Sequence, residues 1–514
     1  MKYKFNNFYE FIAFQSKKRK NKTALFLGDE KISYADIHKS ADSLATFLSS
    51  KGIKEGDKVA LFLRNSAEFI YAIFAVSKLG AILVPINTFL KSEELSYILK
   101  DSDSKILIAS AIHDKVVNSS NASTLCEYIL WEGDEKAKGE KHLYFEDALS
   151  VTDEVTHNVR RLDDTAVIVY TSGTTGKPKG AMLSNKNILS NTESGRRTIN
   201  VKPKDRGIVF LPMFHSFTFS IGVMMPLYVG ASIVIIQSIQ PFSNIFKQTL
   251  TKRVTIFFAI PDVYNALSKA KLPWYFMWFN RIRAFISGAA ALQPKTLDAM
   301  AKKFKRATLL EGYGLSETSP AVCMNTFKKQ KVGSVGTALY GYEMKIVDEE
   351  MKEVNHGTIG DIIVKGDNVM QGYLNRPTAT EETIVNGWLI TGDLGYMDDD
   401  GFLFIVDRRK DLIISKGINI YPREIEEVID GFNGVSASAV IGVVDEKSGE
   451  APVVYIELCE DVDTLDEQGL KKYMREHLAN YKIPKQIHII DELPKNATGK
   501  VLKRVLKENL KEEV

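Results

Sequence analysis

Cysteine is scarce in this sequence of 514 residues, and the positions of its three cysteines exclude two kinds of architecture. Cys126, Cys323 and Cys459 lie far apart and form no CxxC pair. Such spacing supports neither a disulfide framework nor a zinc site, and it is typical of proteins in a reducing compartment. We therefore expect a cytoplasmic location.

A strong charge of one sign is also missing. The 67 basic and 64 acidic side chains leave a net charge of +3. A protein whose main partner is nucleic acid usually carries a marked basic excess, so we expect no nucleic-acid partner. The length exceeds what one hydrophobic core supports, and it predicts two to four domains.

Long uninterrupted apolar runs are absent. Polar residues interrupt the N-terminal MKYKFNNFYEF, which therefore does not resemble a secretory signal. Residues 207–246 contain no Asp, Glu, Lys or Arg, but Pro212, Pro226 and Gly230 divide them. The apolar stretches are much shorter than the roughly 20 residues of a spanning helix. We expect buried strands and a helix that line a large apolar interior.

The loop at residues 170–180, YTSGTTGKPKG, lacks the Walker A pattern although it is rich in glycine and lysine. Pro178 stands where that pattern needs a glycine, and Lys177 is followed by this proline instead of Ser or Thr. The sequence therefore excludes a P-loop nucleoside triphosphatase of the usual kind. The consecutive hydroxyls, the glycines, Lys177 and Lys179 still suit phosphate oxygens, so we expect a phosphate-binding loop after a buried strand.

Apolar runs alternate with helical patterns on both sides of this loop, which predicts parallel sheets covered by helices. We expect strands at 58–63, 81–86, 105–110, 231–237, 254–260 and 283–290, and helices at 66–80 and 92–102. Ser92 is expected to cap the second helix. Residues 112–160 are polar and lack periodicity, so we place surface elements there. From about residue 332, short strands predict an antiparallel or barrel-like unit, and a separate α+β domain begins after 407–411.

Seven motifs follow one another along the chain: the loop at 170–180, PMFHSFTF (212–219), GAAAL (288–292), EGYGLSET (311–318), WLITGD (388–393), DRRKDLIISKGINIYPREIE (407–426) and PKNATGK (494–500). In order and spacing they resemble the adenylate-forming superfamily of acyl-CoA synthetases, luciferases and peptide-synthetase adenylation domains. The resemblance implies an α/β protein. A large N-terminal domain (1–406) of two stacked αβ-layer subdomains plus a small β-barrel would precede a small mobile C-terminal α+β domain (411–514), with a hinge near 407–410.

The resemblance also implies a two-step reaction that uses ATP, Mg²⁺ and coenzyme A. A carboxylic acid attacks the α-phosphate of ATP and pyrophosphate leaves; a thiol then attacks the acyl-adenylate. Lys500 is implied as the catalytic lysine of the first step and Glu317 as the Mg²⁺ ligand. For the second step, the C-terminal domain would rotate about Lys410 and bring Gly417 to the thiol channel.

For the nucleotide, the resemblance implies that Tyr313 stacks on adenine and that Ser316 lies near the α-phosphate. Asp393 and Arg408 are implied to bind the ribose hydroxyls. The residues implied in ATP binding are Thr171, Ser172, Gly173, Thr174, Thr175, Lys179, Gly288, Ala289, Gly312, Tyr313, Ser316, Asp393, Arg408 and Lys500.

The implied acyl pocket is formed by His215, Phe217, Gly222 and Ala259, and His215 is also the implied gate of this pocket. Relatives that activate amino acids carry an Asp at the position of His215, so an amino acid is disfavoured. A hydrogen-bonded core histidine is the alternative for His215. We expect a medium- to long-chain fatty acid as substrate and coenzyme A as acceptor. An aryl acid and a separate acyl carrier protein are the alternatives.

Two other functions are compatible with parts of the pattern. A luciferase-like oxidoreductase would use the same adenylation chemistry. A nucleotide-binding scaffold without activity would be expected to lose Lys500 or Glu317, and both are present.

The aromatic cluster in KLPWYFMWFNRIRAF (271–285) allows two interpretations. Its rings and the neighbouring basic residues could make a weak peripheral contact with a membrane through residues 274–283. Alternatively, they pack in a core or in a dimer contact. We expect a monomer or a homodimer.

Overall fold

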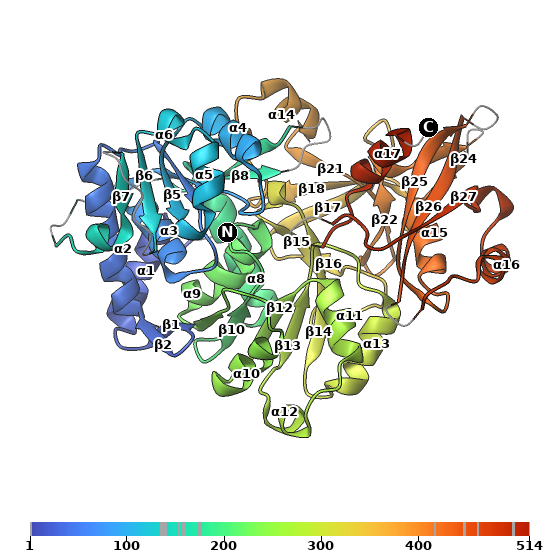
Figure 1. Cartoon of the computed structure of the whole chain (residues 1–514), viewed down its shortest axis with the longest axis horizontal. Coiled ribbons are helices and arrows are strands. Elements are labelled where there is room, and N and C mark those ends of the chain that lie inside the picture. Colours follow the sequence, from blue (N-terminus) through green and yellow to red (C-terminus); the bar gives the residue numbers. More distant parts are fainter. Residues whose placement is uncertain are drawn as a thin grey trace.

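The computed structural model describes residues 3–133, 141–152, 155, 161–171, 177–415, 418–445, 449–459, 462–495 and 499–512. Four sheets organise these residues (Figure 1). In Figure 1 the N-terminal two thirds of the chain occupy the left and centre, and the C-terminal part, in orange and red, lies at the right. The α/β class predicted from the sequence is confirmed.

The first sheet has eight strands in the order β19-β9-β8-β4-β3-β5-β6-β7. Strands β3 to β8 pair in parallel, whereas β9 and β19 add antiparallel pairs at one edge. The strands are β3 (Lys58–Phe62), β4 (Ile82–Pro85), β5 (Ser104–Ser110), β6 (Tyr128–Glu132), β7 (His142–Tyr144), β8 (Thr165–Thr171), β9 (Lys179–Ser184) and β19 (Gly372–Tyr373).

Strand β6 lies where the sequence predicts only surface elements. Ile129, Leu130 and Trp131 are buried in it, and the short helices α5 (Asp114–Ser119), α6 (Ala122–Leu125) and α7 (Phe145–Leu149) lie beside it in the chain. The prediction is wrong here because three apolar residues between polar neighbours are too short a run to show a period.

The second sheet has nine strands in the order β16-β15-β14-β13-β12-β10-β11-β1-β2. Its central strands β14, β13, β12, β10, β11 and β1 pair in parallel, so their carboxyl ends meet at one edge. The strands are β1 (Thr23–Leu27), β2 (Glu30–Ser33), β10 (Arg206–Val209), β11 (Ser232–Ile235), β12 (Ile256–Ala259), β13 (Ala284–Ser287), β14 (Thr308–Gly314), β15 (Ala321–Met324) and β16 (Thr337–Ala338).

Four helices join the two sheets through one hydrophobic core. Buried residues of α1 (Phe8–Lys18), α2 (Tyr34–Ser50), α3 (Ala67–Leu79) and α8 (Asn185–Ile199) pack in the same cluster as residues of β3 and β11. The predicted stack of αβ layers is therefore present. Within α3 every residue except Glu68 is buried, which explains its continuous apolar sequence.

The sequence correctly indicates the ends of helix α3, but it does not indicate the N-cap of helix α4. The Ser66 side chain accepts a hydrogen bond from Phe69 N at the start of α3, and Gly80 ends this helix with φ 68°. In α4 (Ser92–Ser102), however, the N-cap is Lys91, whose backbone N–H donates to the Glu94 carboxylate at 2.9 Å. The prediction that Ser92 caps this helix is wrong, because Ser92 is its first residue.

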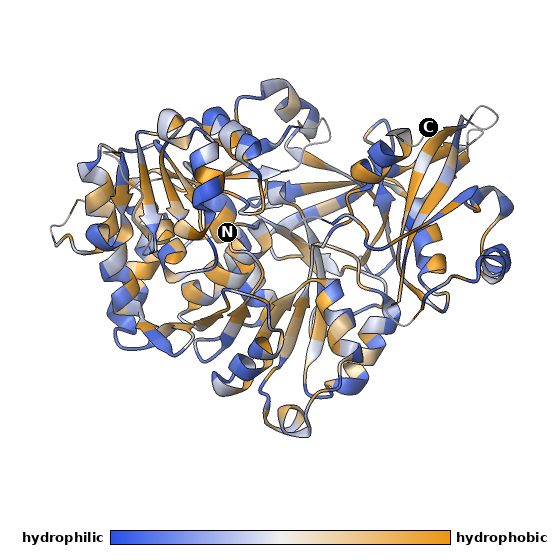
Figure 2. Cartoon of the chain, in the orientation of Figure 1, coloured by the Kyte–Doolittle hydropathy of each residue, from blue (hydrophilic) through white to orange (hydrophobic). Residues whose placement is uncertain are grey.

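The segment without charged residues forms buried elements, as expected. It contains the end of β10, a π-helix η2 (Thr218–Met224), α9 (Met225–Val229) and β11. Figure 2 shows strands of the two large sheets largely in the colour of hydrophobic residues. Among the described residues, none of the helices combines the length and apolar character that crossing a membrane requires.

The third sheet is the small antiparallel unit predicted after residue 332. It pairs β17 with β18 and β18 with β21, while β20 and β22 both pair with β21. Its strands are β17 (Tyr342–Val347), β18 (Gly360–Gly366), β20 (Ile384–Val385), β21 (Trp388–Met397) and β22 (Leu403–Arg408), and α14 (Pro377–Thr383) precedes β20.

A fourth sheet builds the C-terminal part on cores of its own. The sheet changes between β22 and β23, across the short helix η4 (Arg409–Asp411), and the hinge at 407–410 stays a prediction. The elements are β23 (Ile413–Ser415), β24 (Ile418–Ile420), β25 (Val435–Asp445), β26 (Gly449–Leu458), β27 (Gln486–Ile490), α15 (Pro422–Ile429), α16 (Glu467–His477) and α17 (Lys503–Glu512).

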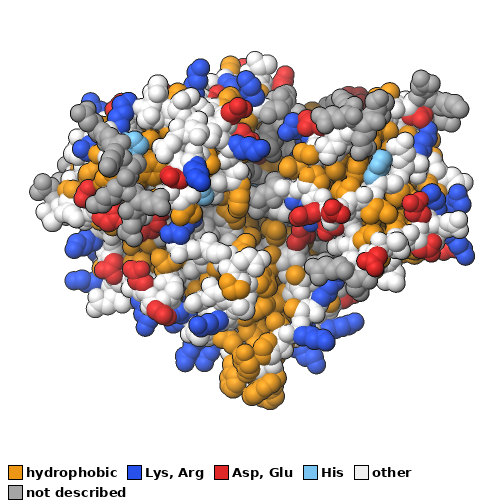
Figure 3. Space-filling view, viewed as in Figure 1, with side chains coloured by type: hydrophobic (Ala, Val, Ile, Leu, Met, Phe, Trp, Pro, Cys, Tyr) orange, Lys and Arg blue, Asp and Glu red, His pale blue; other side chains and the backbone are white. Residues whose placement is uncertain are grey.

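Four further helices cover the second sheet: α10 (Ser243–Thr251), α11 (Pro261–Lys269), α12 (Trp274–Phe279) and α13 (Pro294–Lys303). Helix α12 carries the aromatic cluster singled out in the sequence, and it lies at the lower extremity of the molecule in Figure 1. The space-filling view shows this extremity as a hydrophobic tip (Figure 3).

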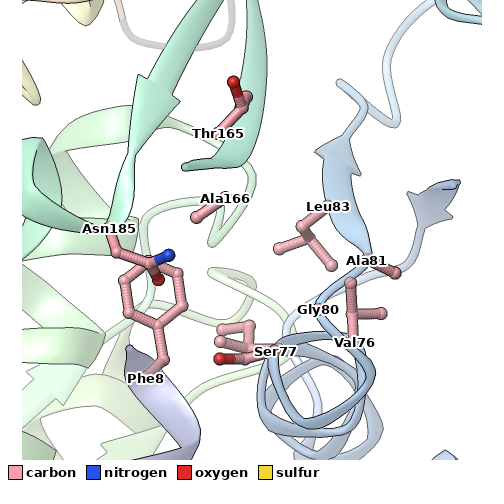
Figure 4. A pocket seen from close by; sticks show the side chains of 10 residues that line it. Phe8, Val76, Ser77, Gly80, Ala81, Leu83, Thr165, Ala166 and Asn185 are labelled. Atoms are coloured by element: carbon pink, nitrogen blue, oxygen red, sulfur yellow. The ribbon is translucent and has the colours of Figure 1, made fainter. Parts of the chain in front are cut away.

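A small cavity lies between α1, α3, β4 and β8 (Figure 4). Its volume of about 10 Å³ suits at most one water molecule. Phe8, Val76 and Leu83 are among its mostly apolar lining residues. This cavity is a packing defect of the core and is too small for a substrate.

Candidate active site

The phosphate-loop motif begins and ends on a β-hairpin. Strands β8 and β9 pair so that Thr171 lies opposite Lys179, and the Thr171 hydroxyl donates to the Lys179 carbonyl oxygen at 3.4 Å. Both ends of the loop are therefore anchored on the paired strands β8 and β9 of the first sheet. Ser172, Gly173, Thr174 and Thr175 lie outside the described residues.

Tyr373 connects this loop with Glu317. It lies on β19, which pairs with β9, and its hydroxyl donates to Glu317 Oε1 at 2.9 Å. The Lys179 ammonium lies 5.2 Å from the centre of the Tyr373 ring. Burial, followed by the Glu317 carboxylate, raises the pKa of Tyr373, so the hydroxyl stays protonated and remains a donor. Tyr373 lies outside the seven sequence motifs, in a strand of two residues, so no local pattern marks it as a site residue.

Tyr313, Asp393 and Arg408 form a second connected group. Asp393 and Arg408 lie opposite each other on β21 and β22. The buried Asp393 carboxylate accepts a hydrogen bond from the Tyr313 hydroxyl at 2.6 Å and lies 3.3 Å from Arg408 Nε. The structure thus brings together three residues that are up to 95 positions apart in the sequence.

Three other motifs meet at the carboxyl ends of the parallel strands of the second sheet. The Ser216 and Ser316 hydroxyls lie 3.1 Å apart. The Phe217 ring lies so close to Gly288 that a Cβ at this glycine would be 3.5 Å from it, and Gly312 O would be 3.8 Å away. Ala289, which follows Gly288 in the chain, has a left-handed φ of 72°. Such a strained conformation is common at functional sites.

His215 is neutral in this setting. Desolvation lowers its pKa to about 4, and the Phe217 backbone N–H donates to His215 Nδ1 at 3.3 Å. Since Nδ1 accepts, the proton of the neutral ring is assigned to Nε2. His215 therefore offers one N–H donor and no charge.

The two small residues assigned to the acyl pocket are both buried. Gly222 lies in η2, where a Cβ would be 3.3 Å from Thr218 and 3.5 Å from Val209. Ala259 ends β12 and pairs with Ser287 of β13. Ala259 belongs to the same hydrophobic core cluster as Phe217. The role of Gly222 and Ala259 as pocket residues stays a prediction.

Glu311, the first residue of the EGYGLSET motif, is a buried acid to which the sequence motifs assign no role. It lies on β14, and its Oε1 accepts a hydrogen bond from the Leu292 N–H at 3.0 Å. Burial raises the pKa of Glu311 to about 7, against the opposing effects of this bond and of Arg423. The side chain ties the GAAAL segment to the strand that leads to Tyr313.

Lys500, in the C-terminal part, lies close enough to Arg408 and Asp393 for their charges to affect its pKa. Burial lowers the pKa of Lys500 to about 7; the charges of Arg408 and Lys410 act in the same direction, and Asp393 opposes them. At the preceding Gly499, with φ 75°, a Cβ would lie 2.7 Å from Ile260 Cδ1, so the turn packs on the start of α11.

Polar contacts hold the C-terminal part against the second sheet in this arrangement. Gln293 Nε2 donates to Asp430 Oδ2 at 3.0 Å, and Lys295 Nζ donates to the Asp430 carbonyl oxygen at 2.8 Å. The Lys495 ammonium lies 3.6 Å from Asp262. Lys410 lies in η4, and Gly417 lies outside the described residues.

The side chains present fit a magnesium nucleotide. The cations at Lys179 and Lys500 suit a polyphosphate, and the pair of Arg408 and Asp393 suits ribose hydroxyls. The Glu317 carboxylate suits Mg²⁺, which keeps several waters and takes few protein ligands. Mg²⁺ bound there would neutralise phosphate charge. The individual roles of these residues stay predictions.

Two family models match the chain: the AMP-binding enzyme model over residues 12–374, and the AMP-binding enzyme C-terminal domain model over residues 424–500. Among curated proteins, the long-chain-fatty-acid–CoA ligase FadD13 of Mycobacterium tuberculosis is 34% identical over 487 residues, which cover 93% of each chain.

Two solved structures are similar over nearly the whole chain. The anthranilate–CoA ligase AuaEII in complex with anthranoyl-AMP has a TM-score of 0.91 and 28% identity, covering 99% of this chain and 98% of the ligase. ATP-bound MatB from Rhodopseudomonas palustris has a TM-score of 0.89 and 32% identity, covering 98% and 99%. This chain therefore belongs to the adenylate-forming superfamily as an AMP-forming acyl-CoA synthetase, an acid–thiol ligase that uses ATP, Mg²⁺ and coenzyme A.

Proposed function

We propose that this ligase activates a medium- to long-chain fatty acid to acyl-AMP and transfers the acyl group to coenzyme A. The observation that carries the proposal is the absence of charged residues from the largely buried segment 207–246, in which His215 is neutral. No Asp, Glu, Lys or Arg in this segment could pair with a charged group on the distal part of the acid. The similarity to a long-chain-fatty-acid–CoA ligase supports the same substrate class.

In the first step, the chain has to bring an anionic carboxylate to an anionic triphosphate. Lys500 and Lys179, together with Mg²⁺ held by Glu317, would offset this repulsion with positive charge, and such electrostatic stabilisation is usually the largest contribution a protein makes to this kind of transfer. The pair of Asp393 and Tyr313 would hold the nucleoside, with the carboxylate accepting from the ribose hydroxyls. No side chain needs to form a covalent bond with the acid.

In the second step, the thiol has to approach from the side that Lys500 now occupies. We expect a rotation of the C-terminal part about Lys410 to remove Lys500 and admit the thiol at Gly417. The similarity scores support an adenylation arrangement in the present structure. The TM-score is 0.89 with ATP-bound MatB and 0.78 with the apo form of the same protein.

An aryl acid is the second candidate substrate. The Phe217 ring beside Gly288 offers a flat apolar surface close to the motif that would meet the carboxylate. The similarity to an anthranilate–CoA ligase supports this candidate. Transfer to a separate acyl carrier protein remains the alternative for the second step. We also expect a cytoplasmic location and a monomer or homodimer.

A pyrophosphate-release assay over acids of different shape tests the proposal. Octanoate, dodecanoate and palmitate would be compared with benzoate and anthranilate, each with and without coenzyme A, and the thioester product would be identified by mass. We expect the highest kcat/KM with one of the fatty acids and a thioester only with coenzyme A. A higher kcat/KM with an aryl acid would contradict the fatty-acid proposal and identify aryl acids as the substrate class. Release of pyrophosphate without formation of a CoA thioester would contradict the proposal that coenzyme A is the acceptor.

A further inference from the structure

Helix α12 exposes large aromatic side chains that a folded chain normally covers. Trp274 is 71% exposed, Trp278 73%, Phe279 68% and Tyr275 47%, whereas Phe276 is only 2% exposed. Phe276 packs on the Phe246 ring of α10 at a centroid distance of 5.2 Å. One ring therefore anchors the helix, and the other four form a continuous tip, here named the aromatic tip (Figure 3).

The aromatic tip is held in place by polar contacts with the body of the protein. Arg306 Nη2 donates to the carbonyl oxygens of Met277 at 2.7 Å and of Trp278 at 2.9 Å. Asn280 Nδ2 donates to the carbonyl oxygen of Phe276 at 2.9 Å. Because these bonds satisfy carbonyl groups at the C-terminal end of α12, this end can enter an apolar medium at a lower desolvation cost.

Basic residues predominate in the segment of the chain that carries the aromatic tip. Between residues 247 and 283 the chain has seven basic residues and one acidic residue, Asp262. The exposed basic residues of this segment are Lys247, Arg253, Lys269, Lys271 and Arg281, and Lys271 and Arg281 stand close to α12 in the sequence. Lys302 and Lys305, near the end of α13, are also exposed, as is the acidic Asp298 of that helix. In Figure 3 blue side chains lie on both sides of the orange tip, and no red side chain is visible beside it.

We propose that the aromatic tip, with Lys271 and Arg281 at its base, docks this protein on an anionic lipid bilayer. Trp and Tyr rings favour the boundary between headgroups and acyl chains, and flanking Lys and Arg favour anionic headgroups. A projecting tip reaches a soft planar surface without a matching groove. The inference goes beyond the proposed function, because it holds whichever acid the enzyme activates.

Vesicle sedimentation with the full chain tests the docking. We expect binding to vesicles of phosphatidylcholine with 30% phosphatidylglycerol, about tenfold weaker binding to phosphatidylcholine alone, and weakening by salt. The triple variant Trp274→Ser/Trp278→Ser/Phe279→Ser should bind the anionic vesicles at least roughly tenfold more weakly. Lys271→Gln/Arg281→Gln should reduce the preference for anionic vesicles.

The matched control is Ile112→Ser/Tyr481→Ser, which removes two exposed apolar side chains (60% and 45% exposed) far from α12 in the sequence. This control should bind vesicles like the wild type. Equal loss in the control and the triple variant, or no binding of the wild type, would overturn the proposal.

Fluorescence keeps the test decisive if the triple variant is unstable. Vesicles with brominated acyl chains should quench the wild-type tryptophan emission, because two of the four tryptophans lie on the tip. Trp274→Phe/Trp278→Phe keeps the apolar rings, so it should still sediment with vesicles but lose most of the quenching. Quenching that survives in this variant would contradict the proposal. A dimer that dissociates in the triple variant, with no vesicle binding by the wild type, would assign the tip to a second copy instead.

Discussion

At the scale of single residues, Tyr373 gives the most direct test of the phosphate end of the site. Its hydroxyl donates a hydrogen bond to Glu317 Oε1, and its ring lies beside the Lys179 ammonium. Tyr373→Phe removes the hydrogen bond and keeps the ring. We expect the KM for MgATP to rise about tenfold, since a hydrogen bond to a charged group contributes roughly 1.5–3 kcal/mol. The KM for coenzyme A should not change, and an unchanged KM for MgATP would show that this bond does not orient Glu317.

Lys500 separates the two half-reactions. We expect Lys500→Ala to lower the rate of acyl-AMP formation by about 10²–10³-fold, because one fixed charge at the reacting phosphate is lost. The same variant should still convert preformed acyl-AMP and coenzyme A to the thioester. Single-turnover assays of each half-reaction measure both rates, and an equal loss in both would contradict the assignment.

The pKa of Lys500 predicts a pH profile. Its lowered value of about 7 means that the cationic form is full below this pH and is lost as the pH rises through it. We expect kcat/KM for ATP, which reports the free enzyme, to fall above about pH 7. Lys500→Arg should remove this decline, because arginine stays charged. A decline that persists in Lys500→Arg would point to another group.

The sequence motifs indicated many of the candidate site residues, but they did not indicate which of these residues bond to one another. The motifs gave Lys500, Glu317, Tyr313 and Asp393 as candidates, because each stands in a distinctive local pattern. Nothing local predicted that Tyr313 would donate to Asp393, or that Tyr373 would reach Glu317. Such bonds form between strands that are distant in the sequence, so only the packed chain shows them.

At the scale of elements, α13 and the C-terminal part make a contact that can be weakened without touching the nucleotide. Gln293 and Lys295 donate to Asp430 from the start of α13. We expect Gln293→Ala/Lys295→Ala to slow acyl-AMP formation about tenfold, since two hydrogen bonds contribute roughly 1–3 kcal/mol together. Thioester formation from preformed acyl-AMP should keep its rate.

The control for this experiment is Lys302→Ala, an exposed basic residue near the other end of α13. It should leave both half-reactions unchanged. If the double variant slows both half-reactions alike, the contact supports general stability and does not favour the adenylation arrangement.

Elements with long apolar runs and clear caps were predictable, and short ones were not. Helix α3 is buried on nearly all sides, and it lies between a Ser cap and a terminal glycine. These two residues mark its ends in the sequence. Strand β6 has only three buried apolar residues at its centre, and pairing with β5 and β7 decides its conformation. Tertiary pairing overrode weak local preference there.

At the scale of the whole molecule, the proposed site draws on two parts of the chain that have hydrophobic cores of their own. Asp393 and Arg408 lie on strands β21 and β22, Glu317 lies in the short helix η3 (Ser316–Thr318), and Lys500 belongs to the C-terminal part. The order of motifs predicts contributions from both parts, and the roles of these residues stay predictions. The packing of Gly499 on Ile260 could not be predicted, because it depends on the angle between the parts.

This burial of Lys500 has a thermodynamic consequence for the assembled molecule. With a pKa of about 7, part of the nucleotide-free population carries an uncharged amine near neutral pH. A bound polyphosphate will raise that pKa, so ATP binding near neutral pH should take up protons from solution. Calorimetry in buffers of different ionisation enthalpy measures this uptake, and Lys500→Ala should abolish it. The enzyme would then bind ATP more tightly as the medium becomes more acidic within this range.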